Sequence, residues 1–588
     1  MRKPIYLLFL LVSFFTITTA QQKFYVNLND RADDQFKVTI TPNGLTSANK
    51  IFQFASTAPG TYQTMDIGRF VKSFRAYDET GNEIDCKQIQ TNQWEISDPA
   101  KAKKIVYNIA ETWDTPVKTN NVYAMSGTSL ENDHAVINGQ AVFGYFHGKQ
   151  KDSIEIKLDY PTDWNIGTAL RQNSNGFYYA KDYDEVVDSP IMLGKLTKTS
   201  TKIENTNIDI YSYSKTGKIS AESLLLILED MLSATSQFTD GLPVNNYTFL
   251  FHFENFSAGA WEHNYSSFYV FAESDLSDRF TQELKSVAAH EFYHIVTPLN
   301  IHSELIGNFN FERPTMSQHI WLYEGVTEWA SDILQMRDYL ITLEEYDKQV
   351  KSKLMMNDNF DQTISLTDLS LHSTEMQDQY PNIYQKGALV AGLLDIRLLQ
   401  LSNGKKGLRE VINQLYKDYG ANKAFSEKDF FDEFVKRTYP EIADFINRYI
   451  KGSEKLPVEE YYGWLGIGYK EIVGVDSSKI ALGFGISVKD GKFIVSKVDI
   501  PTADGVAAGD FILKVNGEEV NMQNAQTKFA FMSKMKVGES FNLTVDRKGE
   551  EKEIKVSMQP RPIKHEFKIM DNATEQQFSL RSAWMQNL

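Results

Sequence analysis

Cysteine is almost absent from this sequence: its 588 residues contain one, Cys86. A single cysteine cannot form a disulfide within the chain, so a small disulfide-held fold is excluded and the folded state must depend on hydrophobic cores. Beyond the N-terminal stretch, no apolar run approaches the ~20 residues of a transmembrane helix, so the mature chain is expected to lack a membrane span. At roughly 100–200 residues per domain, the length predicts three or four domains.

Positively charged residues are fewer than negatively charged ones. The chain has 61 Lys and Arg against 77 Asp and Glu, a formal net charge of −16. Such a chain repels a phosphate backbone, which argues against nucleic acid as a partner. Internal repeats and low-complexity linkers are missing too. The 42% apolar and 23% charged content is typical of globular proteins and argues against disorder or a fibre.

The N-terminus has the features of a secretory signal. Arg2 and Lys3 supply positive charge, an apolar or small stretch covers 5–17, and small residues precede Ala20. We therefore expect a signal peptide over 1–20, cleavage after Ala20, and a periplasmic or secreted protein. The alternative is an anchor that is not cleaved.

Hydrophobic patterning divides the remaining chain into four parts. Short alternating runs separated by Gly, Pro, Asn and Asp predict an all-β domain over 21–203. In 204–455 a few apolar strands are followed by a long helical stretch, and 461–560 returns to short strands around one helix near 524–534. The last part, 561–588, has no clear pattern and is expected to be a tail. The predicted fold class is multidomain α+β.

The strongest chemical signal is the sequence H-E-x-x-H, which spans His290, Glu291 and His294 in a predicted helix over 283–296. Residues four apart lie on the same face of a helix, so both imidazoles can reach one Zn²⁺. Glu291 lies about 100° around the helix from His290, at the edge of that face. It can contact the reactive water without being a ligand, as the general base of a metallopeptidase does. The alternative is a pair of structural histidines on a buried helix.

A third protein ligand is expected in a later helix of the chain. Glu324 and Glu328 are four residues apart in a predicted helix that follows His294 by about 30 residues. We assign Glu324 as the third zinc ligand and Glu328 as the carboxylate that orients a ligating imidazole. Glu328 could instead be a solvated helix charge. A third histidine of the metzincin type is excluded because Thr297 and Asn300 occupy the required Gly and His positions, and His302 is a less favoured ligand.

Two further residues could take part in catalysis. Tyr384 begins an apolar helix and could donate a hydrogen bond to the oxyanion of the reaction, although spacing alone favours a packing role. Glu262 precedes the apolar strand 267–272, where a carboxylate beside a zinc cleft could bind the α-ammonium of a substrate. An ordinary loop carboxylate is the alternative.

Together these segments resemble the M61 family of glycyl aminopeptidases, gluzincin-type zinc peptidases with a C-terminal PDZ domain. The resemblance is carried by H-E-x-x-H, then Glu-Gly-x-Thr at 324–327, then Tyr-x-Lys-Gly at 384–387. The family's G-G-L-E-H-like and P-G-x-Y segments are matched by Gly259-Ala260-Trp261-Glu262-His263 and Pro59-Gly60-Thr61-Tyr62. The likeness covers nearly the whole mature chain.

The resemblance implies a thermolysin-like, mostly helical catalytic domain over 204–455 and a PDZ-like domain over 461–560. It implies that Tyr384 stabilises the oxyanion, that Glu262, with Gly259 and His263 beside it, binds the substrate amine, and that small N-terminal residues such as Gly or Ala are preferred. The sequence departs from the family at Ala260 and Trp261, where Gly and Leu are usual.

In the PDZ-like part, Leu482, Gly483, Phe484 and Gly485 resemble the loop that presents backbone N–H groups to a peptide C-terminus. A PDZ-like domain that only packs on the catalytic body is the alternative. For the whole chain we expect a Zn²⁺-dependent aminopeptidase that acts on peptides. Its rivals are a zinc endopeptidase and a catalytically silent protein that binds peptides through the PDZ-like domain.

Overall fold

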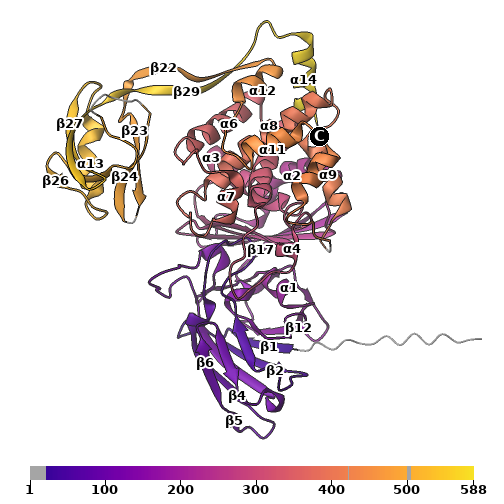
Figure 1. Ribbon diagram of the computed structural model, residues 1–588. Helices are drawn as coiled ribbons and strands as arrows, with labels where there is room; N and C mark the ends of the chain where they lie inside the picture. Colours follow the sequence, from indigo (N-terminus) through magenta and orange to yellow (C-terminus); the bar gives the residue numbers. More distant parts are fainter. Residues whose placement is uncertain (1–21, 422, 490, 500–504, 588) are drawn as a thin grey trace, which may run out of the picture.

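The computed structural model describes residues 22–421, 423–489, 491–499 and 505–587. The predicted signal peptide lies outside these residues. Along the chain, Figure 1 shows strands at the N-terminal end, a sheet covered by helices in the middle, and a separate strand-rich body at the end of a long two-stranded arm. This arrangement agrees with the predicted α+β class, while the exact domain boundaries remain a prediction.

The N-terminal region consists of three sheets around one aromatic-rich core. Eight strands form the sheet β14-β15-β12-β1-β2-β8-β4-β5, and two four-stranded sheets have the orders β13-β16-β10-β9 and β11-β3-β7-β6. Alternating residues of β1 and β2 are buried, as expected of strands with one face on a core. The strands are β1 Gln22–Asn27, β2 Gln35–Pro42, β3 Ile51–Phe54, β4 Val71–Tyr77, β5 Glu83–Ile84, β6 Cys86–Gln90, β7 Gln93–Ile96, β8 Lys104–Ala110, β9 Ser129–Leu130, β10 His134–Ile137, β11 Gly144–Phe146, β12 Ile154–Asp159, β13 Asn165–Thr168, β14 Arg171–Gln172, β15 Tyr178–Ala180 and β16 Ile191–Gly194, with one short helix, α1 Tyr183–Val187.

The middle region has a five-stranded sheet of order β17-β18-β19-β21-β20. Its three central strands are parallel, and β20 pairs antiparallel with β21 at the edge. Strand β19 is buried on both faces, which is typical of a strand covered on each side. The strands are β17 Thr197–Ile203, β18 Thr206–Ser214, β19 Asn246–Glu254, β20 Gly259–Glu262 and β21 Ser266–Ala272.

Helices cover one face of this sheet and share a continuous core with it. Several begin with a side-chain cap, such as Ser220 before α2 and Ser277 before α3, each of which accepts a hydrogen bond from the backbone three residues on. The helices are α2 Ala221–Phe238, α3 Asp278–Tyr293, α4 Glu304–Gly307, α5 Val326–Arg337, α6 Leu343–Asn357, α7 Leu366–Leu371, α8 Asn382–Leu401, α9 Leu408–Asp418, α10 Phe430–Arg437, α11 Ile442–Tyr449 and α12 Val458–Trp464, and a π-helical turn, Trp321–Gly325, precedes α5. Among the described residues, none of these helices has the length and apolar character needed to cross a bilayer.

The C-terminal body has the order β23-β24-β25-β27-β28, with β26 paired to β25. The predicted strands and the predicted helix near 524–534 are all present. The elements are β22 Ile467–Ala481, β23 Phe484–Lys489, β24 Lys492–Val498, β25 Phe511–Val515, β26 Glu518–Glu519, α13 Ala525–Phe529, β27 Ser540–Arg547, β28 Glu550–Ser557, β29 Gln559–Ile569 and α14 Glu575–Met585.

Over 561–587, the part of the expected patternless tail that the structure describes, the chain instead contributes to a strand and forms a helix. Strand β29 pairs with β22 along the arm seen in Figure 1, and α14 returns to pack on the helices of the middle region through Trp584, which is 1% exposed. The strand pairs join residues 78 to 102 positions apart, and the backbone of Trp584 accepts a hydrogen bond from Arg337 across 247 positions. The sequence does not reveal them because β29 is largely exposed and α14 buries a single large side chain.

Candidate active site and metal centre

Helix α3 places the two histidines of H-E-x-x-H together at its C-terminal end. His290 and His294 are one turn apart, and their ring centroids are 4.8 Å apart. Both side chains are buried, with 8% and 1% of their surface exposed. The helical spacing that predicts a shared face is therefore realised.

Glu324 lies opposite both imidazoles. Its Oε2 atom is 3.6 Å from Nε2 of His290 and 3.6 Å from Nε2 of His294. Atoms bound at ~2.0–2.1 Å to one tetrahedral ion are roughly 3.3–3.4 Å apart, so a small contraction suffices for these three donors to hold Zn²⁺. Glu324 belongs to the π-helical turn before α5, a local widening that is frequent at functional sites. The donor set thus fits a metal ion.

The outer nitrogens of both imidazoles are held by hydrogen bonds. Nδ1 of His290 is 2.9 Å from Glu328 Oε2, and Nδ1 of His294 is 2.8 Å from the carbonyl oxygen of Thr297. Each bond fixes the ring so that Nε2 is directed toward Glu324, which is the arrangement that metal-binding imidazoles require. Lys353 pairs with Glu328 and, at 3.0 Å, with Asp332. Sequence patterns gave no indication of Lys353 or Asp332.

Negative charge exceeds positive charge in this buried site, and the pKa values reflect it. Burial alone would lower the pKa of His290, but the carboxylates of Glu324 and Glu328 raise it well above its ordinary value. Burial raises the pKa of Glu291 to about 7, with Glu324 adding to the rise and His290 opposing it. A divalent cation between the imidazoles and Glu324 would compensate this excess charge.

Glu262 joins this group from the edge strand β20. One of its carboxylate oxygens, one from Glu291 and a ring nitrogen of His294 all lie within 4.8 Å of one another. Burial, followed by the nearby Glu324 and Glu291, raises the pKa of Glu262 well above its ordinary value. In the described part of the chain, no other side chain donates a hydrogen bond to this carboxylate. Among the described residues, its charged form therefore has no ion-pair partner, and the His290 imidazole only partly opposes the rise in its pKa.

The N-terminal region completes the site through the turn at 59–62. A Cβ on Gly60 would lie 2.5 Å from Glu262 Oε1, and Gly60 has a φ of +74°, so a glycine is required there. The ring N–H of Trp261 donates to the carbonyl of Pro59 at 3.1 Å, and the hydroxyl of Tyr62 donates to Glu324 at 3.0 Å. The P-G-x-Y match in the sequence was the one signal that could indicate Tyr62.

Tyr384 enters the site from the first turn of α8. Its ring lies 5.8 Å from the His290 ring, and its hydroxyl is 3.1 Å from that of Tyr380, a residue that the sequence gave no reason to select. Two glycines set this proximity. A Cβ on Gly387 would lie 2.7 Å from the Cα of Gly325, which follows Glu324 directly. The Glu-Gly and Lys-Gly motifs are therefore the two halves of one close helix contact.

This contact predicts the effect of Gly387→Ala. Closing the gap with a methyl group forces α8 away from the turn that holds Glu324, and overpacking of this kind costs about 1–3 kcal/mol, more than the roughly 1 kcal/mol gained from helix propensity. We expect a lower urea midpoint and a lower melting temperature. Gly392→Ala on the same helix is the matched control, since its Cβ would meet nothing closer than 3.4 Å. Equal stability of the two variants would contradict the packing argument.

Three residues singled out in the sequence lie apart from this cluster. His263 directs Nδ1 toward Asp188 at 3.5 Å and packs on the Trp261 ring. Gly259 begins β20 with a φ of +89° and open space at its Cβ position. Nδ1 of His302 is 3.0 Å from the carbonyl of Pro298. The substrate contacts expected of Gly259 and His263 remain predictions.

The candidate PDZ loop faces the catalytic region. Leu482, Gly483 and Phe484 line a pocket together with Asp358 at the end of α6. Asp358 accepts from Lys564 at 2.8 Å and from Lys497 through its backbone carbonyl. Binding of a peptide C-terminus at Leu482, Gly483, Phe484 and Gly485 remains a prediction.

Comparisons with known proteins agree with this architecture. Family models match in three places: the Peptidase M61 N-terminal domain over residues 23–195, M61 glycyl aminopeptidase over 283–390, and a PDZ domain over 480–558. A solved structure, the crystal structure of an aminopeptidase N family protein from Idiomarina loihiensis, is similar over 96% of this chain and 100% of that chain, with a TM-score of 0.77 and 19% sequence identity. At that identity the likeness shows the fold. A search of curated proteins found no match. The chain belongs to the M61 peptidase family and carries a C-terminal PDZ domain.

Proposed function

We propose that this peptidase is a zinc-dependent aminopeptidase that removes N-terminal residues, preferably Gly or Ala, from peptides. The observation that carries the proposal is Glu262: a half-buried carboxylate beside Glu291 and His294 to which, within the described chain, no side chain donates. A free α-ammonium group is the part of a peptide that supplies the missing positive charge. An endopeptidase has no need of such a group in its site.

His290, His294 and Glu324 would hold Zn²⁺, with Glu328 and Tyr62 orienting the donors. When bound, the ion supplies Lewis-acid polarisation of the substrate carbonyl and favours ionisation of water.

The protein's own groups carry out the proton transfers. Glu291 accepts a proton from the attacking water, whose oxygen forms the new bond to the carbonyl carbon. Tyr384 donates a hydrogen bond to the carbonyl oxygen as negative charge develops on it. Glu291 then passes the proton to the leaving amine as the C–N bond breaks. Glu262 binds the substrate α-ammonium throughout and so sets the distance from the N-terminus to the scissile bond.

The preference for small residues rests on the family and on crowding around the amine site. The rings of Tyr62 and Tyr380 are 5.7 Å apart, and both phenols are close enough to Glu262 that its charge contributes to their raised pKa values, after burial and Glu324. A large first side chain would have to fit beside these rings.

A pair of substrates tests the proposal. The purified protein should cleave Gly- and Ala-p-nitroanilide and short free peptides, and it should fail on the same peptides after N-acetylation. Glu262→Gln should lower kcat/KM on free peptides by about 30-fold or more, because a buried charged contact worth about 2–5 kcal/mol is lost. Equal cleavage of acetylated and free peptides would instead identify an endopeptidase.

Glu328 provides a second prediction. Glu328→Gln removes the charge that orients His290, and loss of such an outer partner weakens metal affinity by about 10–100-fold. Competition with a chromogenic chelator for Zn²⁺ measures the change. Glu344→Gln, an exposed carboxylate at the start of α6, should bind Zn²⁺ as the parent does. Unchanged affinity in Glu328→Gln would show that the contact to His290 is structural only.

A further inference from the structure

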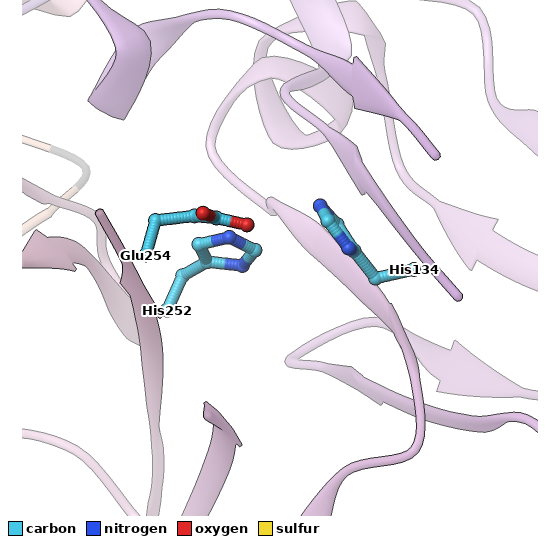
Figure 2. A group of neighbouring side chains, drawn as sticks. All are labelled: His134, His252 and Glu254. Atoms are coloured by element: carbon cyan, nitrogen blue, oxygen red, sulfur yellow. The ribbon is translucent and has the colours of Figure 1, made fainter. Parts of the chain in front are cut away.

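A second group of metal-binding side chains lies away from the active site. His134 of β10 meets His252 and Glu254 of β19, and one donor atom from each lies within 4.8 Å of the other two. Figure 2 shows the two imidazoles and the carboxylate converging from the two regions. The three side chains are 2%, 0% and 6% exposed. The group therefore sits in the buried contact between the N-terminal sheets and the catalytic sheet.

His252 has an unexplained feature. Among the described residues, neither Nδ1 nor Nε2 of this fully buried ring has a hydrogen-bond partner. Leaving a buried polar group unpaired costs about 1–3 kcal/mol. The ring shares its face of β19 with Leu250, which packs in the small core between the two regions. A phenylalanine would fill this place without that penalty. A buried imidazole is therefore better explained if one of its ring nitrogens binds a ligand.

The other two side chains are held in place. Nδ1 of His134 is 3.0 Å from Asp133, which accepts from Tyr213 at 2.9 Å, and this pairing resembles the Glu328 contact that orients His290. Nε2 of His134, the nitrogen left to bind a cation, is 3.2 Å from the Ser129 hydroxyl, which can rotate away when an ion binds. The Tyr213 ring stacks on His252 at 4.5 Å and lies 4.4 Å from His134, which fixes both rings. A preformed donor set of this kind loses little conformational freedom on binding an ion.

Glu254 retains a free donor atom. Its contacts from Lys215, at 2.6 Å, and from the backbone of Asn255, at 3.1 Å, both go to Oε2. Oε1 is available for a cation, and the Lys215 side chain is 51% exposed, so it can move into solvent at small cost.

We propose that His134, His252 and Glu254 bind a second divalent cation, best Zn²⁺, that ties the N-terminal β region to strand β19 of the catalytic sheet. Two imidazoles and one carboxylate suit Zn²⁺, whereas Ca²⁺ and Mg²⁺ prefer oxygen donors. The site acts as a clamp between two regions that must stay in register, because the turn at 59–62 contributes to the active site.

Metal content of the full chain tests this proposal. After saturation with Zn²⁺ and dialysis, elemental analysis should find two Zn²⁺ in the parent and one in His252→Phe, a replacement that keeps the stacking on Tyr213. Glu324→Gln should also retain one, and the double variant close to none. If His252→Phe does not fold, Glu254→Gln replaces it as the variant that lacks one ligand of the new site. Trp113→Phe, which removes an indole that packs on His252 without being a ligand, is the control and should retain two.

The second readout is the melting temperature in the Glu324→Gln background, where added Zn²⁺ can act only at the new site. We expect Zn²⁺ to raise it by about 2 °C or more, and to leave the double variant unchanged. Equal Zn²⁺ content with and without His252 would overturn the proposal. If the catalytic assignment fails instead, Glu324→Gln keeps the parent's metal content while His252→Phe still loses one ion.

Discussion

Glu291→Gln should retain its metal and lose its turnover. Gln has the shape of Glu but cannot accept a proton, and a positioned general base contributes about 10²–10⁴-fold to rate. The side chain is not a proposed ligand, and the three donors around it are held by Tyr62, Glu328 and the Thr297 carbonyl. We therefore expect kcat to fall by about that factor while Zn²⁺ content and melting temperature stay at the parent's values.

The matched control is Glu283→Gln, an exposed carboxylate two turns earlier on the same helix. It has the same chemical change and the same helix, and it should cleave peptides at the parent rate. Steady-state kinetics on Ala-p-nitroanilide measures both variants. Turnover by Glu291→Gln within a few-fold of the parent would remove the general base from the proposed mechanism.

The local part of the site could be read from the sequence because helical spacing is short-range information. The i, i+4 relation of His290 and His294 holds once α3 forms, and the same is true of Glu324 and Glu328 across the π-helical turn and α5. The strands and the helix of the PDZ-like body follow from local patterns in the same way.

Contacts between segments that are distant in the sequence could not be predicted from local patterns. Tyr62 meets Glu324 across 262 positions, and Lys353 reaches Glu328 from another helix. No periodicity specifies which loop of one region fits against which strand of another. Likewise, His134 and His252 are ordinary strand residues in the sequence, and only the packing of β10 near β19 gives them a common function. The arm of β22 and β29 was missed for the same reason.

Three glycines of the active site allow close contacts that residue spacing alone does not predict. Tyr384 by spacing alone is a packing residue, yet the Gly325–Gly387 contact brings α8 close enough to the Glu324 turn that its first turn faces His290. Gly60 has the same effect between the N-terminal turn and Glu262. These glycines are needed because two backbones, or a backbone and a carboxylate, approach more closely than any Cβ allows.

Glu324→Gln should have a larger effect than Glu291→Gln. An amide is a weak zinc donor, and a catalytic zinc site depends on three protein ligands, so we expect less than about 0.1 Zn²⁺ at this site after dialysis and at least a 10⁴-fold loss of kcat/KM. Glu324→Asp keeps the charge on a shorter side chain and should retain part of both. Burial alone would raise the pKa of Glu324, but the two imidazoles and the Tyr62 hydroxyl hold it below its ordinary value, so its charge stabilises the folded state at neutral pH. The metal-free Glu324→Gln chain should therefore be less stable in urea than the metal-free parent. Full metal content at the active site of Glu324→Gln would mean that another side chain is the third ligand.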